Sequence, residues 1–294
     1  MGHMSRRTVV ALILALAFAF ACSSQPPVPR SQPSPTPTAT STASPSPALF
    51  RFAAVGDFGD GSAGEKRVAD AIAAEHARRP LDLLLLLGDM VYPDGDPAEV
   101  DKKFRAPYAS VLQAGIDTAA VLGNHDIMTD ADAIADAFGM PGRYYTLARG
   151  PVELFALDSS TGAIDRRQAA WFAAALAASR ARWKIVFMHV PAFSAGRHGP
   201  NPGLQQTLVP LLDRYDVSMV ITGHDHDYQR SVPIRGTVHV VSGGGCCPRP
   251  VGTASYTARS ATGLHFVVVE ASDAGLSLEA IAVDGTVLDR AAIG

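Results

Sequence analysis

The chain has 294 residues, of which 47% are hydrophobic and only 18% are charged. This length suits one large domain or two small ones, and the apolar content predicts a sizeable buried core. The net charge is −3, and no cluster of lysine and arginine is longer than a short pair, which argues against a nucleic-acid-binding surface. The three cysteines are too few for a disulfide scaffold or a cysteine-based zinc site.

The N-terminus has the pattern of an export signal at 1–21. An arginine pair precedes an apolar stretch at 9–21, which is too short to span a bilayer comfortably as a helix. Small residues before Cys22 resemble the lipobox of bacterial lipoproteins, although Phe20 occupies a position usually held by a small residue. We therefore expect an exported protein. It is either anchored to the cell membrane by a lipid on Cys22 or, after plain cleavage behind Ala21, secreted.

Residues 22–48 have the composition of a tether. Proline, serine, threonine and alanine dominate the stretch, and Arg30 is its one charge. Such a composition buries little apolar surface and favours extended conformations. We expect the folded catalytic domain to occupy residues 49–294.

From Phe50 the hydrophobic pattern alternates between strands and helices. The run at 81–87 is almost unbroken, as expected for a strand that is covered on both faces. The stretch 144–158 predicts a hairpin that turns at 149–151. The other predicted strands are 50–55, 118–122, 184–188 and 217–222, and the predicted helices are 65–79, 97–113, 165–182 and 204–214.

After Arg230 the helical patterns disappear. Four further strands, separated by Gly, Asp or Ser turns, are predicted at 236–242, 264–270, 276–282 and 287–291. A βα first half followed by a β-rich second half predicts an α/β fold. In it two mixed sheets pack together with helices outside, as a four-layer αββα sandwich.

Five short polar segments each follow an apolar run, at 56–59, 88–92, 123–126, 188–189 and 223–226. Functional residues of open α/β sheets cluster beyond the carboxyl ends of the strands, so we expect these segments to meet. They supply the carboxylate, phenol, amide and imidazole donors that two adjacent divalent or trivalent ions need. The candidate metal ligands are Asp57, Asp89, Tyr92, Asn124, His189, His224 and His226.

Local spacing gives these candidates a first arrangement. His224 and His226 are two residues apart, so in an extended segment both imidazoles face the same side. Asp89 and Tyr92 are three apart, close enough for one turn to aim both at one ion. A glycine precedes four of the ligands and is expected to let the backbone leave its strand sharply.

In this order, the five segments resemble the calcineurin-like metallophosphoesterases. Most members of that superfamily carry a histidine two residues after the first aspartate, where this chain has Gly59. Instead Tyr92 follows Asp89 at the spacing Gly-Asp-x-x-Tyr, which resembles the purple acid phosphatases, whose tyrosinate binds a ferric ion. Gly223-His224-Asp225-His226 and His198-Gly199-Pro200 resemble the small, single-domain form of that family.

The resemblance implies a ligand set for each of two ions. One ion takes Asp57, Asp89, Tyr92 and His226. The other takes Asp89, Asn124, His189 and His224, so that Asp89 bridges the pair. A charge count independently favours Fe³⁺ with a divalent ion (Fe²⁺, Zn²⁺ or Mn²⁺). Two carboxylates, a tyrosinate and a bridging hydroxide leave such a pair with excess positive charge to attract phosphate, whereas two divalent ions keep none.

The resemblance also implies roles for residues without a ligand position. His125 would hydrogen-bond a phosphate oxygen, with Asp126 fixing its orientation, and His198 would protonate the leaving alkoxide. The expected function is an exported acid phosphatase that hydrolyses small-molecule phosphomonoesters by attack of a metal-bound hydroxide.

Two other functions stay open. A phosphodiesterase or nucleotidase would use the same metals, and its relative activity on bis(p-nitrophenyl) phosphate and on the monoester would separate it from a monoesterase. A non-catalytic lipoprotein that binds phosphate or a partner would be expected to lose ligands, whereas all seven positions are filled here.

Several residues of catalytic type also have structural interpretations. Tyr92 is alternatively a half-buried packing residue. His76, His239 and His265 lie within helix or strand patterns and are expected to be structural. In an exported protein, the adjacent Cys246-Cys247 pair either closes a vicinal disulfide or remains as thiols.

Overall fold

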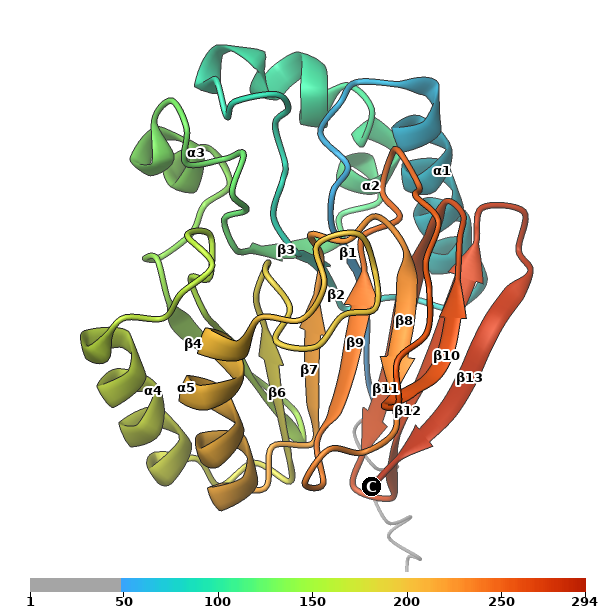
Figure 1. Ribbon diagram of the computed structural model, residues 1–294. Coiled ribbons are helices and arrows are strands. Elements are labelled where there is room, and N and C mark those ends of the chain that lie inside the picture. The colour runs from blue at the N-terminus through green and yellow to red at the C-terminus, as the bar shows by residue number, and fades with distance from the viewer. Residues whose placement is uncertain (1–48) are drawn as a thin grey trace, which may run out of the picture. The chain divides into compact units, whose positions relative to one another are not determined.

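Residues 49–294 are described by the structure, a computed structural model whose helices and strands are labelled in Figure 1. The predictions of a signal peptide at 1–21, a lipid anchor at Cys22 and a tether at 22–48 concern residues outside this described part. Within residues 49–294, no helix is both long and apolar enough to cross a membrane.

One sheet has six strands in the order β13-β12-β11-β1-β2-β3. Its parallel part consists of β1 (Phe50–Val55), β2 (Leu83–Leu86) and β3 (Asp117–Ala120). Its antiparallel part consists of β11 (His265–Ser272), β12 (Gly275–Ala282) and β13 (Val287–Ile293), and β11 pairs with β1. Because β1, β2 and β3 run in one direction, the segments that follow them leave the sheet at a common edge.

The other sheet has seven strands in the order β10-β8-β9-β7-β6-β5-β4. Its parallel part consists of β5 (Val152–Ala156), β6 (Trp183–Phe187), β7 (Met219–Thr222) and β9 (Val238–Ser242). Its antiparallel strands are β4 (Tyr145–Arg149), β8 (Tyr228–Ser231) and β10 (Thr257–Ala261). The hairpin predicted at 144–158 is confirmed as β4 and β5.

The main helices are α1 (Ala63–Arg78), α4 (Arg166–Ala178) and α5 (Pro202–Arg214). Each begins at a polar N-cap whose side chain accepts a backbone N–H from the first turn, namely Ser62, Asp165 and Asn201. Two shorter helices are α2 (Ala109–Gln113) and α3 (Ala131–Ala137). In Figure 1, α4 and α5 lie side by side, and they contact each other.

Three apolar clusters hold the layers together. The central cluster joins the facing sides of the two sheets, with Phe52 and Ile185 as examples. A second cluster packs the outer face of the six-stranded sheet against α1, and a third packs the outer face of the seven-stranded sheet against α4 and α5. Successive strand residues face opposite sides, so Phe52 lies in the central cluster and its neighbour Ala53 in the outer one. The predicted αββα sandwich is confirmed.

The helix predicted at 97–113 is wrong as a continuous element. The chain there forms a 3-10 turn at Pro97–Glu99, a π-helical turn at Asp101–Arg105 and only then α2. Pro107 explains the break, because proline has no N–H and its ring clashes with the carbonyl one turn earlier.

The sequence pattern did not predict three elements of the described residues, namely α3, β8 and β10. Strand β8 reads Tyr-Gln-Arg-Ser, and its polar side chains find distant partners. Arg230 pairs with Asp289, and Gln229 accepts the backbone N–H of Ala195. The local hydrophobicity pattern does not indicate such tertiary contacts, so β8 was not predicted.

Candidate metal centre

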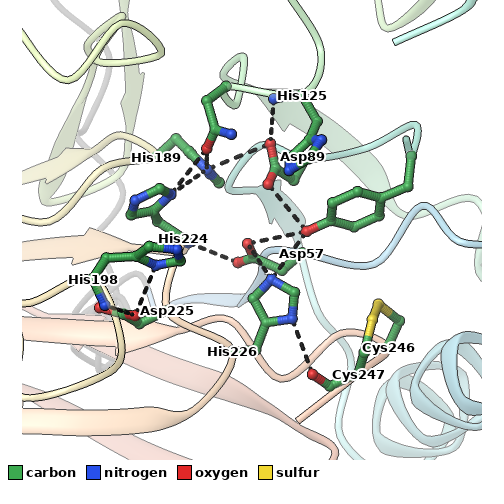
Figure 2. Close-up of polar contacts among 12 residues, drawn as sticks. Asp57, Asp89, His125, His189, His198, His224, Asp225, His226, Cys246 and Cys247 are labelled. Atoms are coloured by element: carbon green, nitrogen blue, oxygen red, sulfur yellow. Dashed lines mark hydrogen bonds and ion pairs between the residues drawn. A yellow bond between two sulfur atoms is a disulfide. The ribbon is translucent and has the colours of Figure 1, made fainter. Parts of the chain in front are cut away.

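All seven predicted ligands come together where the parallel strands end. Figure 2 labels five of them, namely Asp57, Asp89, His189, His224 and His226. Asp57 follows β1, Asp89 follows β2 and Asn124 follows β3 on the six-stranded sheet. His189 follows β6, and His224 and His226 follow β7 on the seven-stranded sheet. The side chains form two adjoining groups, which are described in turn.

The first group surrounds the hydroxyl of Tyr92. Its Oη lies 3.0 Å from Oδ2 of Asp89, 3.4 Å from Oδ1 of Asp57 and 3.2 Å from Nε2 of His226. Nε2 of His226 is also 3.5 Å from Oδ1 of Asp57. Four donors of different residues therefore converge on one small space.

The second group surrounds the amide oxygen of Asn124. This Oδ1 lies 3.1 Å from Nε2 of His189 and 2.9 Å from Nδ1 of His224, and the two ring nitrogens are 3.3 Å apart. Nε2 of His189 is 3.5 Å from Oδ1 of Asp89. One oxygen of Asp89 thus faces each group, as the predicted bridging role requires.

Backbone carbonyls orient two of the imidazoles. Nδ1 of His189 donates to the carbonyl of Leu87 at 2.8 Å, and Nδ1 of His226 donates to the carbonyl of Cys247 at 2.9 Å. Each bond places a ring proton on Nδ1 and directs Nε2 at the other ligand atoms. Such outer bonds are usual around histidines that bind metals.

The electrostatics of the cluster favour a cation. Asp57 and Asp89 are 0% and 2% exposed, and within residues 49–294 their only ion-pair partners are histidines. Burial raises the pKa of Asp57 well above its usual range, and burial together with the two carboxylates raises that of Tyr92. Burial acts to lower the pKa of His189, yet Asp89 and Asp57 raise it to about 10. The residues present therefore fit a pair of metal ions, whose charge would offset the buried carboxylates and allow a tyrosinate.

Backbone geometry brings the ligands to these positions. Asp57, Asp89 and His224 all have positive φ, at 59°, 53° and 71°, a conformation that is uncommon for residues other than glycine and concentrates at functional sites. Gly123 permits close approach, because a Cβ there would lie 2.1 Å from Oδ1 of Asp89. The expectation that 224–226 is extended is wrong. With a left-handed residue at 224, His224 turns to Asn124 and His226 to Tyr92.

The two predicted catalytic histidines border the cluster. His198 stacks on His224 with ring centroids 4.1 Å apart, and its Nδ1 donates to Oδ1 of Asp225 at 2.9 Å. His125 lies edge-on to Tyr92 with centroids 4.7 Å apart, and its ring hydrogen-bonds the carbonyl of Pro93. Both line a cavity of about 180 Å³ that opens onto the ligands.

The predicted role of Asp126 in orienting His125 is wrong. The buried carboxylate of Asp126 instead accepts the backbone N–H groups of Met90, Val91 and Gly123, at 2.8, 3.1 and 2.8 Å. It therefore ties the loop after β2 to the loop after β3. Adjacency in sequence suggested a pair with His125, but the two side chains have different partners.

The site also includes residues to which the sequence alone gave no role. Asp225 fixes His198, and two arginines, Arg197 and Arg249, line the cavity beside the histidines. Two of these residues had a signal in the sequence, because Asp225 lies between His224 and His226, and Arg197 lies next to His198. Nothing in the local sequence marked Arg249.

The remaining cysteines and histidines of the described residues are not among the candidate ligands. Cys246 and Cys247 form a vicinal disulfide, which resolves the alternative left open by the sequence. The pair adjoins the site through the carbonyl of Cys247. His76, His239 and His265 belong to α1, β9 and β11, where His76 accepts the backbone N–H of Leu81.

Sequence comparisons identify relatives of known type. Tartrate-resistant acid phosphatase type 5 of Sus scrofa is 30% identical, in a match that covers 67% of this chain and 70% of the pig protein. The Homo sapiens protein of that name is also 30% identical, with 66% and 72% covered. Purple acid phosphatase 17 of Arabidopsis thaliana is 28% identical, with 60% and 62% covered. These relatives support a metal-dependent hydrolase and imply a dinuclear metal centre.

Solved structures share the fold. Purple acid phosphatase PPD1 from yellow lupin (Lupinus luteus) superposes with a TM-score of 0.73 at 21% identity, covering 83% of this chain and 53% of the lupin chain. GAP50, the anchor in the inner membrane complex of Plasmodium, superposes with a TM-score of 0.75 at 18% identity, covering 84% and 89%. A family model described as calcineurin-like phosphoesterase matches residues 50–228. Since this match spans more than half of the sequence, the chain belongs to the calcineurin-like phosphoesterase family.

Proposed function

We propose that this protein is an acid phosphatase of the purple type, which hydrolyses phosphomonoesters with an Fe³⁺ ion and a divalent ion (Fe²⁺, Zn²⁺ or Mn²⁺). The observation that carries the proposal is the hydroxyl of Tyr92, within 3.4 Å of Asp57, Asp89 and His226. Fe³⁺ would be held by these four residues. The divalent ion would be held by Asp89, Asn124, His189 and His224.

Residues around the metal centre would bind the phosphate group and protonate the leaving oxygen. When bound, the metal pair would act as a Lewis acid and lower the pKa of water to give a nucleophile. His125 and His198 line the cavity and are positioned to hydrogen-bond the phosphate oxygens. With Nδ1 of His198 donating to Asp225, its Nε2 is free to protonate the leaving oxygen. Asp225 is itself fully buried and also accepts from the hydroxyl of Ser194, which keeps the imidazole in place.

Tyr92→Phe tests this proposal. The change removes the phenolate oxygen and keeps the ring, so we expect a folded protein that loses the visible charge-transfer band of an Fe³⁺–phenolate pair. Tyr144→Phe is the matched control, because Tyr144 packs at a tilt against Trp171, outside the ligand cluster. The measurements are the visible spectrum, metal content and activity on p-nitrophenyl phosphate.

A colourless wild type, fully active with zinc or manganese alone, would contradict the iron assignment and make Tyr92 a packing residue. A higher kcat/KM on bis(p-nitrophenyl) phosphate than on the monoester would point to a phosphodiesterase. Absence of both activities in the metal-loaded protein would favour a non-catalytic binding protein. Fold likeness does not exclude that last outcome, since similar folds serve unrelated roles.

We also propose that the protein is exported and anchored by a lipid on Cys22. The proposal rests on the arginine pair, the apolar stretch at 9–21 and the small residues before Cys22. Detergent phase partitioning of the wild type and of Cys22→Ala tests it. We expect the wild type to enter the detergent phase and the variant to be released or to remain unprocessed. Equal partitioning of the two would instead indicate a secreted protein.

A further inference from the structure

Two arginines of the cavity have no part in the proposed reaction. The lining consists of six residues already assigned to the metal centre or to catalysis, together with Arg197 and Arg249. Arg197 precedes His198 in the loop after β6. Arg249 lies in the loop after β9, which is tied to the ligand segment because the backbone N–H of Arg249 donates to the carbonyl of His226 at 2.8 Å.

Neither guanidinium has a carboxylate partner within residues 49–294, whereas Arg143 and Arg230 pair with Asp158 and Asp289 at 2.9 and 2.6 Å. The only carboxylate that lines the cavity is Asp89, which is 2% exposed and already contacts Tyr92 and the backbone N–H of His125. Two positive charges in one small cavity are therefore free to bind an anion.

The two arginines lie nearer to the solvent than the metal ligands do. Asp89 is buried, whereas Arg249 is half-buried and Arg197 is exposed, so the guanidinium groups lie toward the mouth. A phosphoryl group against the metal ligands would fill the deeper part. The cavity of about 180 Å³ adjoins a hollow of about 320 Å³ that shares His198 and His224 with it, so space remains beside the deeper part for a second charged group.

We propose that Arg197 and Arg249 form a subsite for a second anionic group of the substrate. Carboxylate and phosphate both match the planar guanidinium, which binds either one through paired hydrogen bonds. The preferred substrates are thus phosphomonoesters or phosphoanhydrides with a carboxylate or a further phosphate close to the reacting phosphoryl group, because the arginines share one cavity with the ligands. This inference rests on the proposed phosphatase function and adds a substrate class to it.

Three substrates test whether a carboxylate, a second phosphate or neither improves hydrolysis. 2-Phosphoglycolate carries a carboxylate, ethyl phosphate has the same carbon count with a methyl in its place, and inorganic pyrophosphate carries a second phosphate. We measure kcat/KM on each for the wild type, Arg197→Gln, Arg249→Gln and the double variant. Arg180→Gln is the control, because Arg180 is exposed, lies between α4 and β6 at the far end of the strands and loses the same charge.

We expect the wild type to prefer 2-phosphoglycolate or pyrophosphate to ethyl phosphate. Each single substitution should lower that preference about fivefold, as for the loss of one partly exposed charge-assisted hydrogen bond. The double variant should lose most of the preference, and Arg180→Gln should keep it. The larger loss, on 2-phosphoglycolate or on pyrophosphate, identifies the second anion as carboxylate or phosphate.

Equal losses on all three substrates would overturn the subsite, because the arginines would then contact the reacting phosphoryl group or act only by general attraction. An unchanged preference in the double variant would overturn it too. If the wild type hydrolyses none of the three, the proposed function fails only if p-nitrophenyl phosphate is not hydrolysed either, and isothermal titration calorimetry of 2-phosphoglycolate and ethyl phosphate decides the subsite. Tighter binding of 2-phosphoglycolate that disappears in the double variant supports it, and equal affinities refute it.

Discussion

The two sheets contribute different chemistry to one cluster. Every oxygen donor follows a parallel strand of the six-stranded sheet, and these are Asp57, Asp89, Tyr92 and Asn124. Every imidazole follows a parallel strand of the seven-stranded sheet, and these are His189, His224 and His226. The negative charge of the site therefore comes from one sheet and its imidazole ligands from the other, so neither sheet alone holds a complete ligand set.

Hydrogen bonds between the sheets bring the two kinds of donor together. The backbone N–H of His224 donates to Oδ2 of Asp57 at 2.8 Å, and Nδ1 of His189 donates to the carbonyl of Leu87 at 2.8 Å. The backbone N–H of Gly56 donates to the carbonyl of Ser242 at 2.9 Å. The metal centre thus depends on the packing of one sheet against the other as well as on its ligands.

Asp89→Asn is expected to have the largest effect, because Asp89 alone faces both donor groups. Loss of the bridging charge should remove both ions and lower kcat/KM by more than about a thousandfold, since the metals supply several kcal/mol of transition-state stabilisation. Metal analysis and kinetics on p-nitrophenyl phosphate measure this. Asp273→Asn, in the exposed turn between β11 and β12, is the control. Two retained ions in Asp89→Asn would show that Asp89 is no bridge.

His224→Ala is expected to have an intermediate effect, because it removes one neutral donor of the seven-stranded sheet. The divalent ion should be lost and kcat/KM should fall about a hundredfold or more, since two-metal catalysis needs both ions. Asp57, Asp89, Tyr92 and His226 remain, so the visible band of the ferric site should persist. Loss of the band together with the ion would contradict the assignment of the ligands to two ions. His76→Ala, in α1, is the control.

Glu75→Gln is expected to have the smallest effect on activity, because it changes an acid of the sandwich far from the ligands. Glu75 is buried and pairs with Arg51, which also pairs with Glu270, in contrast to the acids of the metal centre. Breaking this pair should lower the free energy of unfolding by about 2–3 kcal/mol without changing kcat, because the buried guanidinium of Arg51 then keeps only Glu270 as a charged partner. Urea denaturation measures the loss.

The pH dependence of that loss has a definite sign. Burial acts to raise the pKa of Glu75, but Arg78 and Arg51 lower it below its usual value. The stabilisation is therefore present above the unfolded-state pKa and is lost as pH falls through the folded-state pKa. The difference between wild type and variant should shrink in acid. Glu99→Gln, in the exposed pair with Lys102, should cost less than about 1 kcal/mol, and an equal cost for both variants would contradict the prediction.

Much of the fold was predictable because hydrophobic periodicity is a local property. The runs that became β1, β2, β6 and β7 are apolar enough to be recognised alone. Strand β8 was not predictable, because its polar residues are satisfied by partners as distant as Asp289.

The candidate ligands were predictable as a set, because each lies just beyond an apolar run and parallel strands deliver such residues to one edge. What those side chains contact was decided by the tertiary structure. The sequence placed Asp126 beside His125, but its carboxylate accepts backbone N–H groups of the loop after β2. The sequence also gave no reason to place Arg249 near Arg197, because the two are 52 residues apart. In the structure they line one cavity. Residue type and strand position follow from local patterns of the chain, whereas hydrogen-bond partners depend on left-handed turns and on sheet packing, which no local pattern encodes.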